Sequence, residues 1–157
     1  MDKDQTKPLK LKPNMPWRIR FGFGLSLVGL FIFVFGARPA LFGLDRSPVV
    51  GFVQIVVFLV GLGIICIGGY VSLASLWGKQ TRSIKADFGL RLISTGCVLA
   101  AFSGMADVFG FGSHPLPGTP YFGPWQARGF EIGEFVIGIG FLLLLPVFRK
   151  PTRNKPN

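Results

Sequence analysis

The chain has 157 residues, of which 50% are hydrophobic and only 15% are charged, and its mean hydropathy is +0.52. Soluble domains carry about 25% charged residues, so this composition excludes an ordinary soluble enzyme and an intrinsically disordered protein. The net charge is +10, and the basic residues lie almost wholly outside the apolar stretches. The chain is therefore predicted to be an integral membrane protein.

Four apolar stretches are candidates for transmembrane helices, each of which needs about 20 apolar residues. They cover residues 19–37, 49–77, about 88–109 and 129–148. We therefore expect an all-α membrane protein with four transmembrane helices. Its predicted parts are a basic tail (1–18), a first hairpin (19–77), a basic loop (78–87), a second hairpin (88–148) with a longer outer loop (110–128), and a basic tail (149–157).

The basic residues predict the orientation of the chain in the membrane. Of the 17 Lys and Arg residues, all but Arg38, Arg46 and Arg128 fall in the tails, in the loop between the hairpins or at its edges. Lys and Arg concentrate on the cytoplasmic side, so both termini are predicted to be cytoplasmic, in a bacterial plasma membrane. Anionic lipids of the inner leaflet are the expected partner of these charges. The sequence holds no basic module of a nucleic-acid-binding protein.

The two hairpins resemble each other in sequence. A shift of 67 residues places Phe21-Gly22 on Phe88-Gly89, and a shift of 77 places Gln54-Ile55 on Glu131-Ile132. Two parallel repeats about a pseudo-two-fold axis along the membrane normal are therefore predicted, although Gly and Phe are common enough here for chance matches. The second and fourth spans are expected to pack closely at four glycines, because small residues let helices approach in lipid. These are Gly61, Gly63, Gly138 and Gly140.

Charged residues near the outer ends of the last two spans are the candidates for a functional site. Asp107 closes the third span, while Glu131 and Glu134 open the fourth with a spacing that puts both on one helix face. If adjacent helices bring these carboxylates together, they form a ligand, ion or proton site with Arg128 and His114 nearby. The alternative is structural, because acids in the first turn of a helix oppose the positive end of its dipole. The ligand spacing typical of metal sites is missing, so no metal and no cofactor are predicted.

The sequence contains no nucleotide-binding, metalloprotease or serine-hydrolase motif. Cys66 and Cys97 fall in mid-span and are expected to pack as small apolar residues. A non-catalytic role is therefore predicted, as a scaffold, an accessory subunit of a membrane complex or a binder of a small ligand. The alternative is a small oligomeric transporter or channel that uses the acidic residues. A second copy of the chain or another membrane protein is the expected protein partner.

Overall fold

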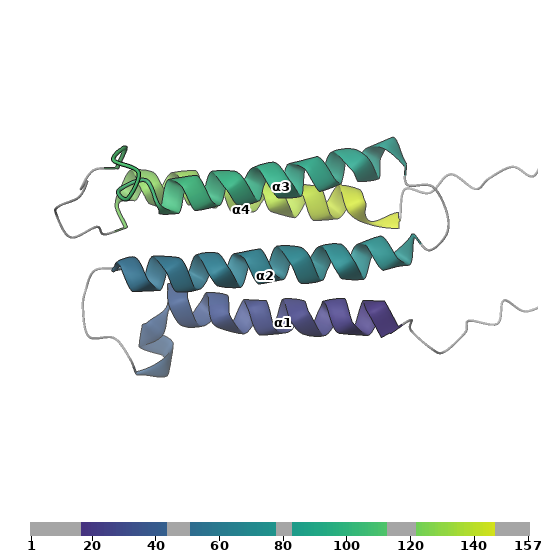
Figure 1. The fold of residues 1–157 in the computed structure, drawn as a ribbon, viewed down its shortest axis with the longest axis horizontal. Helices are drawn as coiled ribbons and strands as arrows, with labels where there is room; N and C mark the ends of the chain where they lie inside the picture. Colours follow the sequence, from purple (N-terminus) through teal and green to yellow (C-terminus); the bar gives the residue numbers. More distant parts are fainter. Residues whose placement is uncertain (1–16, 44–50, 78–82, 113–121, 147–157) are drawn as a thin grey trace, which may run out of the picture.

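The computed structural model describes residues 17–43, 51–77, 83–112 and 122–146, and these residues form an all-helical fold (Figure 1). The elements are α1 (Trp17–Ala37), the short 3-10 helix η1 (Pro39–Phe42), α2 (Phe52–Leu76), α3 (Ile84–Gly104) and α4 (Pro124–Leu144). The helices alternate in direction, so α1 begins and α4 ends at the same end of the molecule (Figure 1). We call this the inner end, following the predicted orientation, and the opposite end the outer end.

Three of these helices, α1, α2 and α3, are long and apolar enough to cross a membrane. A helix of 21 residues is about 30 Å long, which matches the hydrocarbon core of a bilayer. α4 also has 21 residues, but its N-terminal half contains Arg128, Glu131 and Glu134. The helices thus support the prediction of an integral membrane protein, while the fourth span stays a prediction.

The helix boundaries differ from those predicted by hydropathy, because capping residues extend helices beyond the apolar stretches. α3 begins at Ile84, since the Ser83 hydroxyl accepts a hydrogen bond from the Ala86 backbone N–H (3.3 Å), and it ends at Gly104. α4 begins at Pro124, where a proline lacks only an N–H that the first helical turn would leave unpaired. The predicted basic loop 78–87 and outer loop 110–128 are therefore both too long.

Each hairpin is held together by glycines spaced seven residues apart, where the two helix backbones touch. In the first hairpin a Cβ atom on Gly29 would lie 2.7 Å from the Ile65 backbone nitrogen. In the second hairpin a Cβ atom on Gly96 would lie 2.6 Å from the Gly133 carbonyl oxygen. No larger residue fits at these distances, so backbone contact of the kind that associates helices in lipid holds each pair.

These contacts correct the predicted alignment of α2 with α4. Gly61 lies against the Gly29 carbonyl and Gly133 against the Gly96 carbonyl, so Gly61 corresponds to Gly133, 72 residues further along. The predicted shift of 77 residues, which paired Gly61 with Gly138, is wrong. The shift of 67 residues between α1 and α3 agrees with the contacts, since Gly29 and Gly96 occupy the same place in their hairpins.

Of the four glycines predicted to pack the second span against the fourth, two lie in close contact, but with other helices. Gly61 and Gly140 both lie in close backbone contact, but Gly61 contacts α1 and Gly140 contacts α3, so the expected contact between α2 and α4 at these residues is wrong. Gly63 and Gly138 have open space where a Cβ atom would stand. They fail to pack because each lies on a different side of its helix from the heptad glycines.

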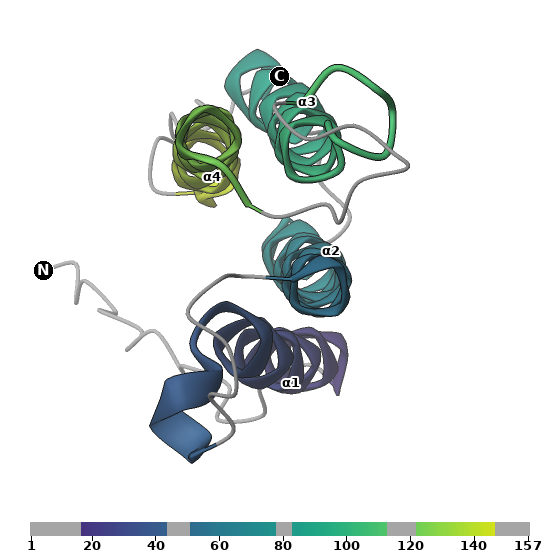
Figure 2. The same ribbon diagram turned by 90° about the vertical axis from the view of Figure 1, so that its left-hand side faces the viewer.

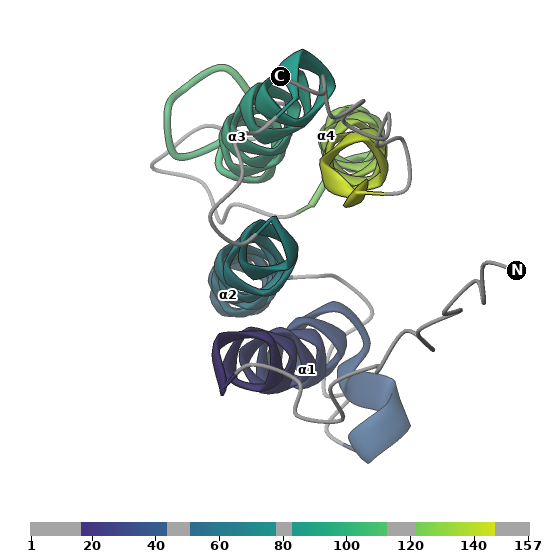
Figure 3. The same ribbon diagram turned by 90° about the vertical axis from the view of Figure 1, so that its right-hand side faces the viewer.

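The two hairpins meet through α2, which lies between α1 and the α3–α4 pair (Figures 2 and 3). α2 contacts both helices of the second hairpin, whereas α1 reaches α4 through Phe33, whose ring stacks on Phe130 with centroids 6.3 Å apart. A two-fold axis within the chain would make the α1–α4 and α2–α3 contacts alike. The contacts between the hairpins are therefore not those of the predicted two-fold arrangement.

Candidate functional site

Asp107, the first of the predicted acidic residues, lies in the turns that follow α3 and is only 3% exposed. Its carboxylate packs against the backbone of Gly112. The N–H groups of Phe111 and Gly112 both donate to the Ala106 carbonyl (2.9 and 3.0 Å), which folds this segment back over Asp107. The residue is thus part of a compact turn that ends α3.

Glu131 and Glu134 lie on α4, with Glu131 exposed and Glu134 half-buried. The Arg128 guanidinium lies 5.3 Å from the centre of the Trp125 ring, in a cation–π contact. Among the described residues no three acidic, His or Cys side chains come together as a metal site would require. The predicted convergence of Asp107, Glu131 and Glu134 is therefore not found in this part of the chain, and His114 lies outside the described residues.

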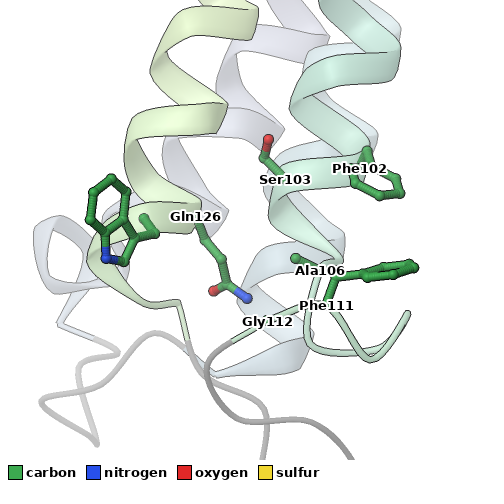
Figure 4. Close-up of a pocket in the computed structure, with 7 residues that line it drawn as sticks. Phe102, Ser103, Ala106, Phe111, Gly112 and Gln126 are labelled. Carbon is green, nitrogen blue, oxygen red and sulfur yellow. The ribbon is translucent and has the colours of Figure 1, made fainter.

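A pocket of about 330 Å³ opens instead at the outer end, between α3 and α4 (Figure 4). Two aromatic rings from the α3 side, Phe102 and Phe111, form one wall with centroids 5.9 Å apart, and Trp125 stands on the other side. The remaining lining residues are Ser103, Ala106, Gly112 and Gln126. The pocket is thus mostly apolar with a few polar groups, as sites for small molecules are.

Gln126 is the distinctive polar residue of this pocket, because its amide oxygen is hydrogen-bonded and its amide nitrogen is not. Its Oε1 atom accepts a hydrogen bond from the Gly123 N–H (2.8 Å) at the start of α4. This bond fixes the orientation of the amide, because the flipped amide would set two donors against each other. The Nε2 atom is buried and has no hydrogen-bond partner within the described part of the chain. In Figure 4 the amide points toward the turn at Gly112.

An unpaired buried donor carries a desolvation penalty of about 1–3 kcal/mol. Buried polar groups in folded proteins nearly always have a partner, so an exception calls for an explanation. The Gln126 side chain is 5% exposed, and it lines a cavity large enough for a small molecule. A ligand with a hydrogen-bond acceptor would satisfy the Nε2 donor and remove the penalty.

Ser103, which lines the pocket, takes the place in α3 that Gly36 holds in α1. A Cβ atom on Gly36 would lie 2.6 Å from the Phe58 backbone nitrogen, so α1 and α2 touch there. Ser103 follows Gly96 by seven residues, as Gly36 follows Gly29, but it carries a side chain. α4 makes room for this side chain with Gly129, where a Cβ atom would lie 2.9 Å from the Ser103 Cβ atom, so α3 and α4 also approach closely here and the pocket lies beside this contact.

The sequence analysis missed this pocket because it assigned Gln126 to the outer loop 110–128. One signal was present in the sequence, since Gly51-x-x-Gln54 and Gly123-x-x-Gln126 share a spacing. The Gly51 N–H likewise donates to Gln54 Oε1 (3.2 Å), so both glutamines cap a helix. Comparison with protein families, with curated proteins and with solved structures finds no match to this chain. The site is therefore interpreted from its own geometry.

Proposed function

We propose that the chain crosses a bacterial plasma membrane four times, with both termini in the cytoplasm. The distribution of Lys and Arg supports this orientation. α4 supports the fourth span, because it equals α1 and α3 in length and packs along α3 through backbone contacts at Gly133 and Gly140. The polar start of α4 then lies near the outer face, where charged residues are tolerated more easily than at the bilayer centre.

We further propose that the two hairpins arose by duplication of one. The contacts at the shift of 67 residues for α1 and α3, and of 72 for α2 and α4, support this proposal. At the second shift several residues are also identical in type. These pairs include Gly51 and Gly123, Gln54 and Gln126, Phe58 and Phe130, Gly61 and Gly133, and Ile65 and Ile137.

The function that the site supports best is the binding of a small neutral molecule at the outer end of α3 and α4, without catalysis. The single observation that carries this proposal is Gln126, a residue that lines the pocket and whose buried Nε2 donor has no partner among the described residues. The ligand has an acceptor oxygen for this donor and a flat apolar part that fits between Phe111 and Trp125. The described lining residues include no carboxylate, histidine or thiol, and their apolar character supports binding.

The proposal is tested by replacing Gln126 with Met, which fills similar space but removes both halves of the amide. Gln54→Met is the matched control, because it removes the equivalent capping bond at the start of α2 and lies outside this pocket. Each protein is extracted from native membranes in a mild detergent and analysed by native mass spectrometry. We expect a non-covalent small-molecule adduct on the wild type and on Gln54→Met.

The Gln126→Met protein should lose most of this adduct, because loss of one hydrogen bond in a buried site lowers affinity by a factor of about 2–10. An adduct of equal occupancy on all three proteins would show that the ligand binds elsewhere. A wild-type protein that carries no small molecule, although it retains its annular lipids, would also contradict the proposal.

A further inference from the structure

The side of α4 that faces away from α3 carries a regular row of exposed residues. Arg128, Glu131, Phe135, Gly138 and Leu142 follow one another at alternating spacings of three and four, and each is exposed. This is the spacing by which one helix packs along another in a left-handed pair. We call this row the α4 seam.

The outer part of the α4 seam carries one charge of each sign. Glu131 lies about 10 Å along the helix from Pro124, near the outer face, where a charge is tolerated more easily than at the bilayer centre but is still stabilised by an ion pair. Arg128 stands one turn away, but its guanidinium lies over the Trp125 ring, and within the described residues it forms no ion pair with Glu131. By contrast the exposed face of α1 is apolar beyond its first turn, as lipid contact requires. That face includes Phe23, Leu27, Leu30 and Phe31.

The corresponding side of α2 is covered by another helix. With the shift of 72 residues, Glu131 and Gly138 of the seam correspond to Leu59 and Cys66 of α2. Leu59 lies against α3, because its Cδ1 atom would be 3.2 Å from a Cβ on Gly104, and Cys66 is buried. In α2 this side therefore receives the second hairpin. In α4 it receives nothing from within the described chain.

We propose that a second copy of this chain covers the α4 seam, so that two α4 helices pack in parallel in a homodimer. Copies in one membrane share their orientation, so their two-fold axis lies along the membrane normal and the two seams meet at equal depth. Arg128 and Glu131 differ by about 4.5 Å along the helix, so Arg128 of each copy reaches Glu131 of the partner subunit. A surface with both charges is complementary to itself.

Gly138 adds the close approach that this contact needs. A Cβ atom at Gly138 meets no atom within 4 Å, so the glycine is not required for packing inside the chain. Small residues at a lipid-exposed position are typical of helix–helix interfaces. Two independent features of the α4 seam, the opposite charges of Arg128 and Glu131 and the open position at Gly138, thus both favour a second copy of the chain as the partner. The dimer is argued independently of the pocket, since the seam shares no residue with the pocket lining.

The test uses disulfide cross-linking in membranes, with Cys66 and Cys97 replaced by Ala. A single cysteine is introduced at Gly138 or Leu142 in the seam, or at Gly24 as a matched control, because Gly24 is an exposed glycine with an equally open Cβ position on α1. After oxidation with copper phenanthroline we expect a disulfide-linked dimer from Gly138→Cys and Leu142→Cys and only monomer from Gly24→Cys. Two seam positions are used so that the test still works if one of the two substitutions prevents folding.

Charge reversal separates the proposed pairing from chance collisions. In the Leu142→Cys background, Arg128→Glu or Glu131→Arg alone should abolish the dimer band, and the double reversal should restore it. Monomer at both seam positions, equal dimer from Gly24→Cys, or cross-linking to a different protein would overturn the proposal. Failure here leaves the mass-spectrometric test of ligand binding intact, because that test depends only on Gln126.

Discussion

Replacing Gly29 with Ala should separate the helices of the first hairpin. The new methyl group would lie 2.7 Å from the Ile65 backbone nitrogen and 2.9 Å from the Gly61 carbonyl oxygen, well inside ordinary contact of 3.4–4 Å. Because backbone atoms cannot move aside as a flexible side chain can, α1 and α2 must shift apart. Overpacking of this kind costs about 1–3 kcal/mol.

The control is Gly24→Ala in the same helix, where a Cβ atom meets nothing within 4 Å. Both substitutions gain about 0.8–1.0 kcal/mol of helix propensity, so this gain cancels when the two variants are compared. The difference in unfolding free energy should therefore be the overpacking cost alone, with Gly29→Ala the less stable by about 1–3 kcal/mol. It can be measured by steric trapping in bicelles, and equal stability of the two variants would refute backbone contact at Gly29.

Two further predictions concern the arrangement of the hairpins. Cys66 on α2 interacts with Cys97 on α3, so mild oxidation should link them by a disulfide. If a protease site is introduced between residues 79 and 82, the two halves of the cut and oxidised chain should stay together until the disulfide is reduced. Separation of the cut halves without reductant would show that α2 and α3 do not meet at this level. Reporter fusions at Gly43 and Gly118 should be external and a fusion at Asn157 internal, whereas an external C-terminus would contradict the proposed four spans.

The hydropathy of the sequence predicted the helices, because lipid selects apolar stretches regardless of how helices pack. It did not predict how the hairpins align. The tripeptides Gly61-Leu62-Gly63 and Gly138-Ile139-Gly140 look alike, and matching them led to the shift of 77 residues. Only one glycine of each tripeptide lies in close contact, so the tripeptide is not the unit that packing preserves.

The unit that packing preserves is the seven-residue spacing, because it returns a glycine to the same side of the helix after two turns. Gly61 and Gly68 in α2 show this spacing, and so do Gly133 and Gly140 in α4. All four have backbone atoms of the neighbouring helix within 3.0 Å of their Cβ positions. Sequence comparison by spacing, rather than by local similarity, would have found this alignment.

The candidate site was harder to predict, because a charged residue in a span indicates a functional site, whereas a neutral amide gives no such signal. Asp107 is the more conspicuous residue, yet its carboxylate is held in the turn against Gly112. Gln126 became visible only when the Gly123 N–H was found to occupy one half of its amide and the other half was found unpaired. Both facts depend on where α4 begins, which hydropathy placed five residues too late.

The two hairpins differ at one step of the glycine row. Gly22, Gly29 and Gly36 follow one another in α1, and Gly89 and Gly96 continue the same spacing in α3 until Ser103 interrupts it. The sizes are exchanged at this step, because Gly36 lies beside Val57 of α2, whereas Ser103 lies against Gly129, the residue of α4 that corresponds to Val57. Ser103 and the capping residue Gln126 both line the pocket at the outer end of α3 and α4. A glutamine that caps a helix can thus also contribute to a pocket, without any new polar residue having to be placed in the membrane.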